Sequence, residues 1–428
     1  MPAVVEARVH RASGVVELAL TNGVPVFVRP MPGTGRVVMI VSVLGAEAME
    51  RPEQWGITRI GAAGWRPSGE AGPSARWRAW PGPDGLSLRL SGSAESVRLG
   101  VESVARALAD PAVDAEALSA WRQRGALRRR GSFVGGERLV ADAVLDVMAP
   151  GLGLSRPAVG PGEAAEPEVV RSWLRWCVRS LPIEVSVVGE ITPAQAAEWV
   201  APPLAALPAR PAEALAALEA RRSVAMAEAR STVVGHGGLP PGRAYAVVAL
   251  PGPALRDLDE LRACTIGARI AHDRLGPALR SAGIEAGASG VLCLPGRVYR
   301  ASGIVLASVR VEGNADDARR AQDVALAVLA DLAARGPDDA EVRRLADGAA
   351  DEAERRLGDA DYWAMILSGS RFHGVAPDEL MGAPGRYRSM TAASVAAALG
   401  RRVDPGRAYR VVVQPAAAEG GEAPAGVP

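Results

Sequence analysis

Histidine is the side chain on which metal and acid–base chemistry most often depend, and this sequence has few of them. The four histidines, His10, His236, His272 and His373, are spread along the chain, and no two lie within one helical turn of each other. A helical zinc site needs two ligands on one face, so the spacing indicates ordinary surface or core histidines. No G-x-S-x-G motif supports a serine nucleophile.

The cysteines and the overall charge also indicate no particular chemistry. Cys177, Cys264 and Cys293 are far apart, form no C-x-x-C pair and are odd in number, which predicts reduced thiols and a cytoplasmic location. The chain starts without a signal-like apolar run, and no stretch approaches the about 18 apolar residues of a membrane span. With 49 basic and 48 acidic residues, the net charge of +1 gives no general case for nucleic-acid or membrane binding.

One local run of charge needs its own interpretation. Residues 122–130 contain five arginines, and Trp121 beside them is the only stacking partner for a nucleotide. At helical spacing these arginines point around the axis and form no single stripe. A solvated helix end, or one paired with an acidic partner, is favoured over a nucleic-acid surface.

The elements that would position a site repeat along the 428 residues, a length that suits two domains of roughly 200 residues each. In the first half, strands are expected within 14–30 around Asn22-Gly23 and at 35–45, 86–92 and 183–190, with helices at 93–111 and 114–130. In the second half, strands are expected at 243–252, 300–313 and 407–415, with helices at 258–275, 316–336 and 339–358.

This repeat predicts an α+β fold with two homologous α/β-sandwich-like domains, each a mostly antiparallel sheet with helices packed on one side. The expected boundaries are an N-terminal extension over 1–14, a first domain over 15–202, a linker over 203–230, a second domain over 231–414 and a disordered tail over 415–428. The linker assignment rests on mixed Pro and Ala/Glu/Arg composition, and the tail assignment on low complexity.

The order of these segments resembles that of the pitrilysin, or insulinase-like, zinc metallopeptidases, especially the short bacterial members and the subunits of the mitochondrial processing peptidase. The resemblance covers roughly residues 15 to 415. It is carried by LTNGVPVFVRP (20–30), VSVLGAEAMERPEQWGI (41–57), IEVSVVGEITPAQAAEWVAPPLAALPARP (183–211), LGPALRSAGIEAG (275–287) and YRASGIVLASVRV (299–311).

The resemblance implies a metal site that this sequence does not have. The family's helical H-x-x-E-H motif, with two zinc ligands and a general base, falls here on Arg59, Ala62 and Ala63 within GITRIGAAGW. The family's third ligand is a Glu on a later helix, but there is no Glu or Asp between Glu116 and Glu137. We therefore expect a degenerate metal site, no catalytic residues, and no zinc or other cofactor on this chain.

The resemblance also implies a substrate contact and a partner. Arg280 matches a family Arg that helps to hold the substrate backbone, whereas the matching Tyr is absent near Gly287. Short family members often pair a zinc-bearing chain with one that lacks the motif. The sequence is thus interpreted as a non-catalytic, peptide-binding subunit that is inactive alone and supports a homologous zinc endopeptidase, as in peptide precursor maturation. The alternative is a catalytically inactive structural, assembly or peptide-binding protein.

Overall fold

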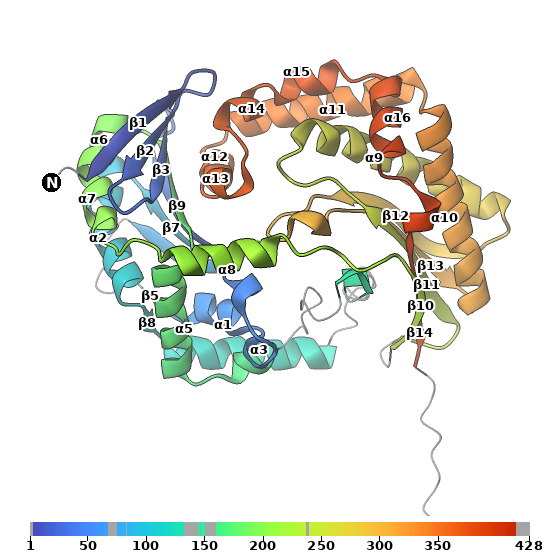
Figure 1. Cartoon of the computed structure of the whole chain (residues 1–428), viewed down its shortest axis with the longest axis horizontal. Helices are drawn as coiled ribbons and strands as arrows, with labels where there is room; N and C mark the ends of the chain where they lie inside the picture. The colour runs from blue at the N-terminus through green and yellow to red at the C-terminus, as the bar shows by residue number, and fades with distance from the viewer. Residues whose placement is uncertain are drawn as a thin grey trace, which may run out of the picture.

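The computed structural model describes residues 3–66, 75–82, 84–131, 144–145, 147–149, 160–236 and 239–416, with the backbone alone for 125–131 and His236. These residues form two β-sheets, one in each half of the chain, and each sheet is accompanied by helices (Figure 1). The predicted α+β class with mostly antiparallel sheets is confirmed, since only the β3–β9 and β10–β14 pairs among the described strands are parallel.

The first sheet has seven strands in the order β1-β2-β3-β9-β4-β7-β6. Their bounds are β1 Val4–His10, β2 Val15–Leu20, β3 Pro25–Pro30, β4 Val37–Leu44, β6 Arg76–Gly82, β7 Gly85–Gly92 and β9 Ile183–Gly189. The predicted hairpin forms between β2 and β3, with Gly23 at a φ of 81°. Residues 4–10, which the sequence assigned to an extension, form an edge strand paired with β2.

The second sheet has five strands in the order β10-β14-β11-β13-β12. Their bounds are β10 Ser231–His236, β11 Arg243–Pro251, β12 Ala286–Leu294, β13 Ile304–Glu312 and β14 Tyr409–Pro415. This order repeats the β3-β9-β4-β7-β6 part of the first sheet, including the parallel pair at its start. The repeat in sequence pattern is therefore a repeat in topology. A small sheet joins β5 Trp65–Arg66 to β8 Ala112–Val113.

The helices of the first half cover one face of the first sheet because their apolar residues recur at helical spacing. In α2, for example, Val97, Val101, Val104 and Leu108 face the core, and the Ser93 hydroxyl caps the N-terminus. The helices are α1 Ile57–Gly64, α2 Ala94–Ala109, α3 Ala115–Gly131, α5 Pro167–Ser180, α6 Pro193–Trp199, α7 Ala201–Ala205 and α8 Ala212–Arg222, with 3₁₀ turns η1 Glu47–Met49, η2 Pro52–Gln54 and η3 Pro161–Ala164.

The helices of the second half include the core helices of the second sheet and a group of short helices near the C-terminus. They are α9 Leu258–Ser281, α10 Ala315–Arg335, α11 Asp339–Leu357, α12 Ala360–Leu367, α13 Ser370–His373, α14 Pro377–Met381, α15 Ala383–Arg388 and α16 Ala392–Gly400, with η4 Arg300–Ser302 and η5 Pro405–Arg407. Helices α9, α10, α11 and α16 pack on one face of the second sheet in one apolar cluster.

Each sheet is also covered on its other face by residues from the opposite half. Trp363 and Leu367 of α12 pack with Phe27 and Ile40 of the first sheet. Reciprocally, Val144, Val147 and Met148 pack with Val247 and Val411 of the second sheet. Both faces of each sheet are therefore buried. The expected helices cover one face, and residues from the opposite half of the chain cover the other. For this reason the residues on both faces of β4 are almost all apolar.

The expected linker is ordered over much of its length. Helix α8 lies within it, and Leu218 of that helix is buried in the first core. A Cβ at Gly45, whose φ is 81°, would lie 2.6 Å from the Leu218 side chain, so a glycine is needed there. The expected tail lies outside the described residues beyond position 416. None of the helices within the described ranges is long and apolar enough to cross a membrane.

Candidate functional site

The helix that carries the expected metal positions is α1, and a buried acid fixes its N-terminus. The Glu50 carboxylate accepts hydrogen bonds from the backbone N–H of Gly56 at 3.0 Å and of Thr58 at 2.9 Å. These N–H groups have no partner within the helix, and an acid at this end complements the helix dipole. Trp173 of α5 donates to the Thr58 hydroxyl at 3.0 Å, which ties α1 to the helix behind it.

The three expected metal positions lie on α1 but carry no metal-binding group. Arg59 Nη2 lies 3.5 Å from Glu163 Oε1, and the two side chains are 17% and 3% exposed. Ala62 is buried in the first core, and Ala63 is half-buried. An arginine and two methyl groups therefore stand where the resemblance expects two zinc ligands and a general base. These residues do not fit a zinc ion.

Glu163 joins α1 to α3, the helix on which the resemblance expects the third zinc ligand. Trp121 of α3 donates its indole N–H to Glu163 Oε2 at 3.0 Å. The next residue, Arg122, donates to the backbone carbonyl oxygens of Glu163 at 2.9 Å and Ala165 at 2.6 Å. A buried carboxylate bridging an arginine and an indole thus links these two helices.

Two glycines allow Glu163 to come this close. Gly56 has a φ of 94°, and a Cβ there would lie 2.7 Å from Glu163 Cγ. A Cβ at Gly162 would lie 2.2 Å from the backbone oxygen of Gln54. Sequence reasoning missed Glu163, which lies 104 positions after Arg59. The local sequence PGE at 161–163 predicts a turn, but nothing in it indicates that this turn packs against α1.

Within the described ranges, no group of three or more His, Cys, Asp or Glu side chains is arranged to hold a metal ion. Three of the histidines have separate surroundings: His10 lies 3.2 Å from Glu17, His272 accepts from the Val291 N–H at 3.4 Å, and His373 lies 3.1 Å from Asp84. The side chain of His236 is outside the described part.

A cavity of about 1100 Å³ lies between the two halves. Its first wall is the face of β4, β6 and β7 opposite α1, and its second wall is formed by α9, α11, α12 and α15. Apolar and aromatic side chains, among them Trp80, Tyr362 and Tyr387, line it together with several arginines. Such a mixture of apolar walls and a few polar groups is typical of a ligand-binding cavity.

Asp84 connects the two walls of this cavity. It lies between β6 and β7, accepts from Arg297 Nε at 2.9 Å and lies 3.1 Å from His373 Nε2. Burial alone would raise the pKa of Asp84, but hydrogen bonds from His373 and Arg297 lower this pKa to about 2. Both partners belong to the second half, so this charged cluster holds the two halves together.

The expected substrate contact lies outside the cavity wall. Arg280 is exposed on the last turn of α9 and is not among the residues that line the described cavities. Arg269, three turns earlier on the same helix, is also exposed and does line the large cavity. The cavity arginine Arg89 is engaged, since it donates to Asp361 at 2.5 Å.

Strand β6 forms an edge of the first sheet and is a place where an extended peptide could pair. Its partner in the sheet is β7, and no strand within the described ranges covers its other side. Helix α1 packs against β6, and Trp80 and Gly82 of β6 line the large cavity. A peptide added to this edge by backbone hydrogen bonds would therefore run between α1 and the cavity.

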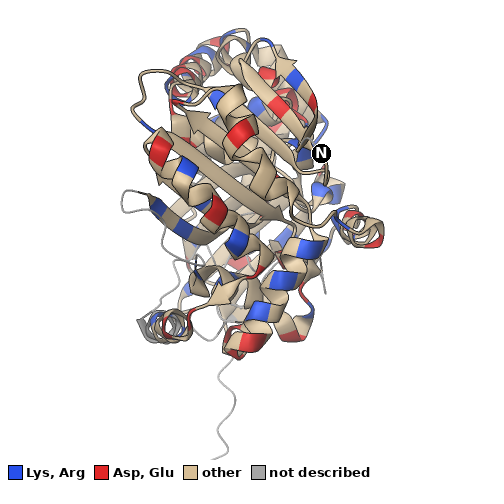
Figure 2. Cartoon of the chain, turned by 90° about the vertical axis from the view of Figure 1, so that its left-hand side faces the viewer, with Lys and Arg blue, Asp and Glu red and all other residues tan. Residues whose placement is uncertain are grey.

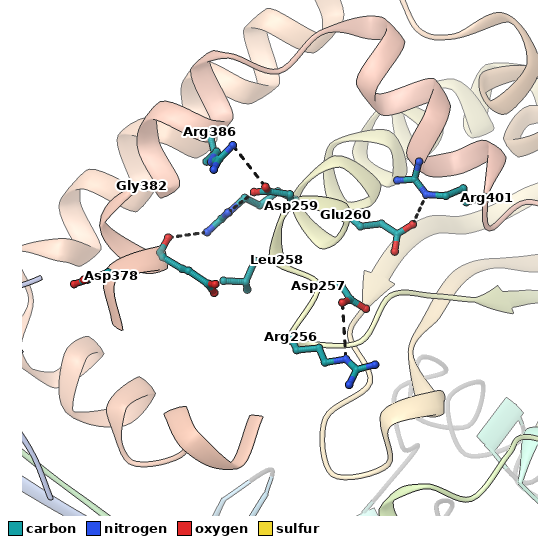
Figure 3. A pocket seen from close by; sticks show the side chains of 11 residues that line it. Arg256, Asp257, Leu258, Asp259, Glu260, Asp378, Gly382, Arg386 and Arg401 are labelled. Atoms are coloured by element: carbon teal, nitrogen blue, oxygen red, sulfur yellow. Dashed lines mark hydrogen bonds and ion pairs between the residues drawn. The ribbon is translucent and has the colours of Figure 1, made fainter. Parts of the chain in front are cut away.

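A second, more polar pocket of about 700 Å³ surrounds the N-terminus of α9 (Figure 3). Its charges are largely paired with one another: Arg401 donates to Glu260 at 2.8 Å (Figure 3). Arg262 donates to Asp259 at 2.9 Å. Asp378 accepts from the backbone N–H and the hydroxyl of Ser13, both at 2.8 Å, across the two halves. This pocket is interpreted as a structural cluster of ion pairs.

On the outer face of the first half, basic and acidic residues are interspersed along the ribbon (Figure 2). On α5, Arg171 and Arg175 pair with Asp110 at 3.0 Å and 2.9 Å. Within the run 122–130, Arg122 is half-buried and donates to backbone carbonyl oxygens, whereas Arg124 is exposed. The side chains of 125–131 lie outside the described part.

No protein-family model and no curated protein sequence matches this sequence significantly. Solved structures do match its fold. The chain is similar to the periplasmic protease PqqL from Escherichia coli, with a TM-score of 0.75, 12% identity, and coverage of 96% of this chain and 46% of PqqL. It is similar to an M16 peptidase inactive domain from Pseudomonas fluorescens, with a TM-score of 0.71, 15% identity, and coverage of 94% and 98%.

It is also similar to a chain of complex III2 from Candida albicans, with a TM-score of 0.67, 14% identity, and coverage of 93% of this chain and 95% of that one. Pitrilysin matches with a TM-score of 0.63, and this chain spans 45% of its length. The chain therefore spans about half the length of PqqL and of pitrilysin. At these identities the likeness is one of fold, and the fold is the one that the sequence resemblance implied.

Proposed function

We propose that this chain, which has the two-domain fold of the M16 peptidases, is the non-catalytic subunit of a paired zinc endopeptidase that encloses and cleaves a peptide. The observation that carries the proposal is the ion pair between Arg59 of α1 and Glu163 of the η3 turn. A chain that fills the expected metal positions with an arginine and two alanines has no zinc of its own to activate water. The zinc and the catalytic residues would then belong to a homologous partner.

The size of the chain supports pairing. PqqL and pitrilysin are about twice as long as this chain, which matches less than half of each. The chain has the size of one half of such a protein, and a second half is needed to close a chamber around a peptide. A specific partner interface of this kind should bury at least ~1,000 Å².

The cavity and the β6 edge support an extended peptide as the ligand. The β6 edge offers backbone groups for pairing, and the cavity beside it offers apolar and aromatic side chains for the peptide's own side chains. Arg269 lines this cavity and is the arginine that we propose for contact with the peptide. The family resemblance implies Arg280 as the alternative contact, and this residue is exposed on α9 outside the cavity wall.

The proposal is tested by purifying the tagged full-length chain from its source organism and identifying what stays bound. We expect a protein of similar length that carries an H-x-x-E-H motif, and about one zinc ion per complex. We also expect chelator-sensitive peptide cleavage by the complex and none by this chain alone. Recovery of the chain without any such protein contradicts the proposal, and so does stoichiometric zinc on the isolated chain.

A second candidate is a structural or assembly protein. The similarity to a chain of complex III2 favours it, because that match spans nearly the full length of both chains. The same purification separates the two candidates. A structural role predicts several unrelated partner proteins and no zinc-dependent cleavage. The proposed cytoplasmic location is a separate expectation from the sequence, and PqqL is described as periplasmic.

A further inference from the structure

Two cysteines that are 29 positions apart in the sequence meet in the second half of the structure. Cys264 lies on α9, and Cys293 lies on the edge strand β12. Both pack in one small apolar cluster with Ala263, Ala398 and Met390. Sequence reasoning treated all three cysteines as isolated, because their spacing forms no known motif. The contact arises because α9 packs on the sheet that contains β12.

The two thiols differ in their access to solvent. Cys264 is 0% exposed, whereas Cys293 is partly exposed and lines the large cavity. A small molecule in the cavity can therefore reach Cys293 first, whereas Cys264 is covered by the protein. This is the arrangement of an accessible thiol and a resolving thiol.

The polar groups around the pair favour a thiolate at Cys293. Hydrogen bonding from the Cys264 thiol, aided by the positive charge of Arg402, lowers the pKa of Cys293 against the effects of burial and Glu260. Hydrogen bonding to Cys293, together with burial, raises the pKa of Cys264. The thiolate is the nucleophile in thiol–disulfide exchange, so Cys293 is the group that reacts first.

We propose that Cys293 and Cys264 form a redox-active dithiol on the cavity wall, a modification site that takes low-molecular-weight disulfides as its substrate. This inference is independent of the proposed function, because it needs neither a zinc-bearing partner nor a peptide.

The reaction is a two-step exchange. The Cys293 thiolate attacks one sulfur of the small disulfide, forms a mixed disulfide, and releases one small thiolate. With Cys293 no longer negative, one cause that holds Cys264 protonated is removed. Cys264 then loses its proton to solvent and attacks the Cys293 sulfur, which releases the second small thiolate. The dithiol is oxidised by two electrons, the small disulfide is reduced by two electrons, and the new bond ties α9 to β12.

The test uses the full-length protein, oxidised glutathione in excess, and alkylation of the remaining thiols before mass spectrometry. The expected wild-type product carries no glutathione, is lighter by two hydrogen atoms, and keeps one of its three thiols. Peptide mapping without reductant should join the peptide of Cys264 to that of Cys293. A wild-type protein that keeps all three thiols free overturns the proposal, as does a stable glutathione adduct on the wild type.

Single variants test the order of the two steps. Cys264→Ser should accumulate a glutathione adduct on Cys293, because nothing resolves it. Cys293→Ser should leave Cys264 at least ~10-fold slower to react, since this thiol is buried. Cys177→Ser is the control, because Cys177 is fully buried in the first core, and it should behave as the wild type. Absence of an adduct in Cys264→Ser, with the fold checked by circular dichroism, overturns the proposal; if that variant does not fold, the wild-type peptide map decides.

Discussion

Arg59 and Glu163 form an ion pair 3.5 Å long between α1 and the η3 turn, in the region where the family resemblance expects a zinc site. Glu163 also accepts from Trp121 of α3, so one carboxylate links the two helices that should have supplied the metal ligands. The carboxylate is 3% exposed and is engaged by an arginine. This region therefore lacks the expected ligands and also contains an internal ion pair between the two helical segments.

Restoring the motif should fail for this reason. We expect the combined Arg59→His, Ala62→Glu and Ala63→His variant to bind far less than one zinc ion per chain. Ala62 is 1% exposed, so Ala62→Glu alone should lower the free energy of unfolding by ~3 kcal/mol or more. Metal analysis and denaturant unfolding measure the two effects. The control is Ala217→Glu on the exposed side of α8, expected to change stability by under ~0.5 kcal/mol.

Stoichiometric zinc in the triple variant, sensitive to chelators, would contradict this prediction. So would chelator-sensitive peptide cleavage by that variant without any partner, because the third ligand would then have to come from a residue that we have not identified.

Removing the bridging carboxylate should destabilise the first half. Glu163→Ala leaves the Arg59 charge and the Trp121 indole N–H without this partner, which should lower the free energy of unfolding by ~2–4 kcal/mol. Glu168→Ala is the control, because the Glu168 side chain is 82% exposed and lies 3.8 Å from Arg171, a contact worth under ~1 kcal/mol. Equal unfolding midpoints for both variants would show that the bridge contributes nothing.

A buried acid should make stability depend on pH. Glu184 of β9 accepts from the Arg371 N–H at 3.0 Å, and burial raises the pKa of Glu184 from 4.5 to about 8. Between these values the folded state holds a proton that the unfolded state has lost. The stabilising contribution is therefore complete below pH 4.5 and is lost as the pH rises to about 8, with a slope of at most ~1.4 kcal/mol per pH unit.

Unfolding of the wild type and of Glu184→Gln, measured from pH 4.5 to 8, checks this slope. The variant should lose most of the decline with rising pH. Glu198→Gln, an exposed acid on α6, should keep it. Parallel curves for the wild type and Glu184→Gln would be evidence against a protonated Glu184 in the folded protein.

The Asp84 cluster should hold the two halves together. Asp84→Asn removes the charge that Arg297 and His373 face, so we expect a loss of ~2–3 kcal/mol at neutral pH. Because hydrogen bonds from these partners lower the pKa of Asp84 to about 2, its contribution is present above pH 3.8 and is lost as the pH falls toward 2. Asp110→Asn, which removes a surface acid, is the control and should change stability far less than Asp84→Asn. Equal acid sensitivity of the wild type and Asp84→Asn contradicts the prediction.

Two arginines on α9 should differ in their effect on the paired enzyme. Arg269 lines the cavity, so Arg269→Ala should slow peptide turnover by the complex by ~10-fold or more. Arg280 lies outside the cavity wall, so Arg280→Ala should cost under ~3-fold. Turnover and co-purification are measured for both, since each variant should still assemble. The reverse order of effects would assign the peptide contact to Arg280.

The sequence predicts the repeated sheets well, because their signals are local. The Asn22-Gly23 hairpin, the apolar run of β4 and the helical spacing in α2 all depend on neighbouring residues, and all appear in the structure. The sequence did not predict the edge strand β1. Most of its residues are exposed, and the strand is defined by its pairing with β2.

The relationships that define the candidate site were less predictable, because they depend on how distant segments pack. The degenerate positions on α1 could be recognised from a motif. Glu163 lies beside α1 because two glycines leave room for the segments to pack closely, and no local pattern indicates this contact. The covering of the first sheet by Trp363 and the meeting of Cys264 with Cys293 likewise arise from tertiary packing. Short helices such as α12 and α13 are too brief to show a clear period.

The most direct test of the central claim is peptide turnover by the zinc-bearing partner, measured with and without this chain. The natural peptide, or a library of unstructured peptides, is incubated with the purified partner alone, this chain alone, and the two together at equal concentration. We predict that only the mixture cleaves, that a chelator stops it, and that zinc restores it. A partner that is fully active without this chain would contradict the account.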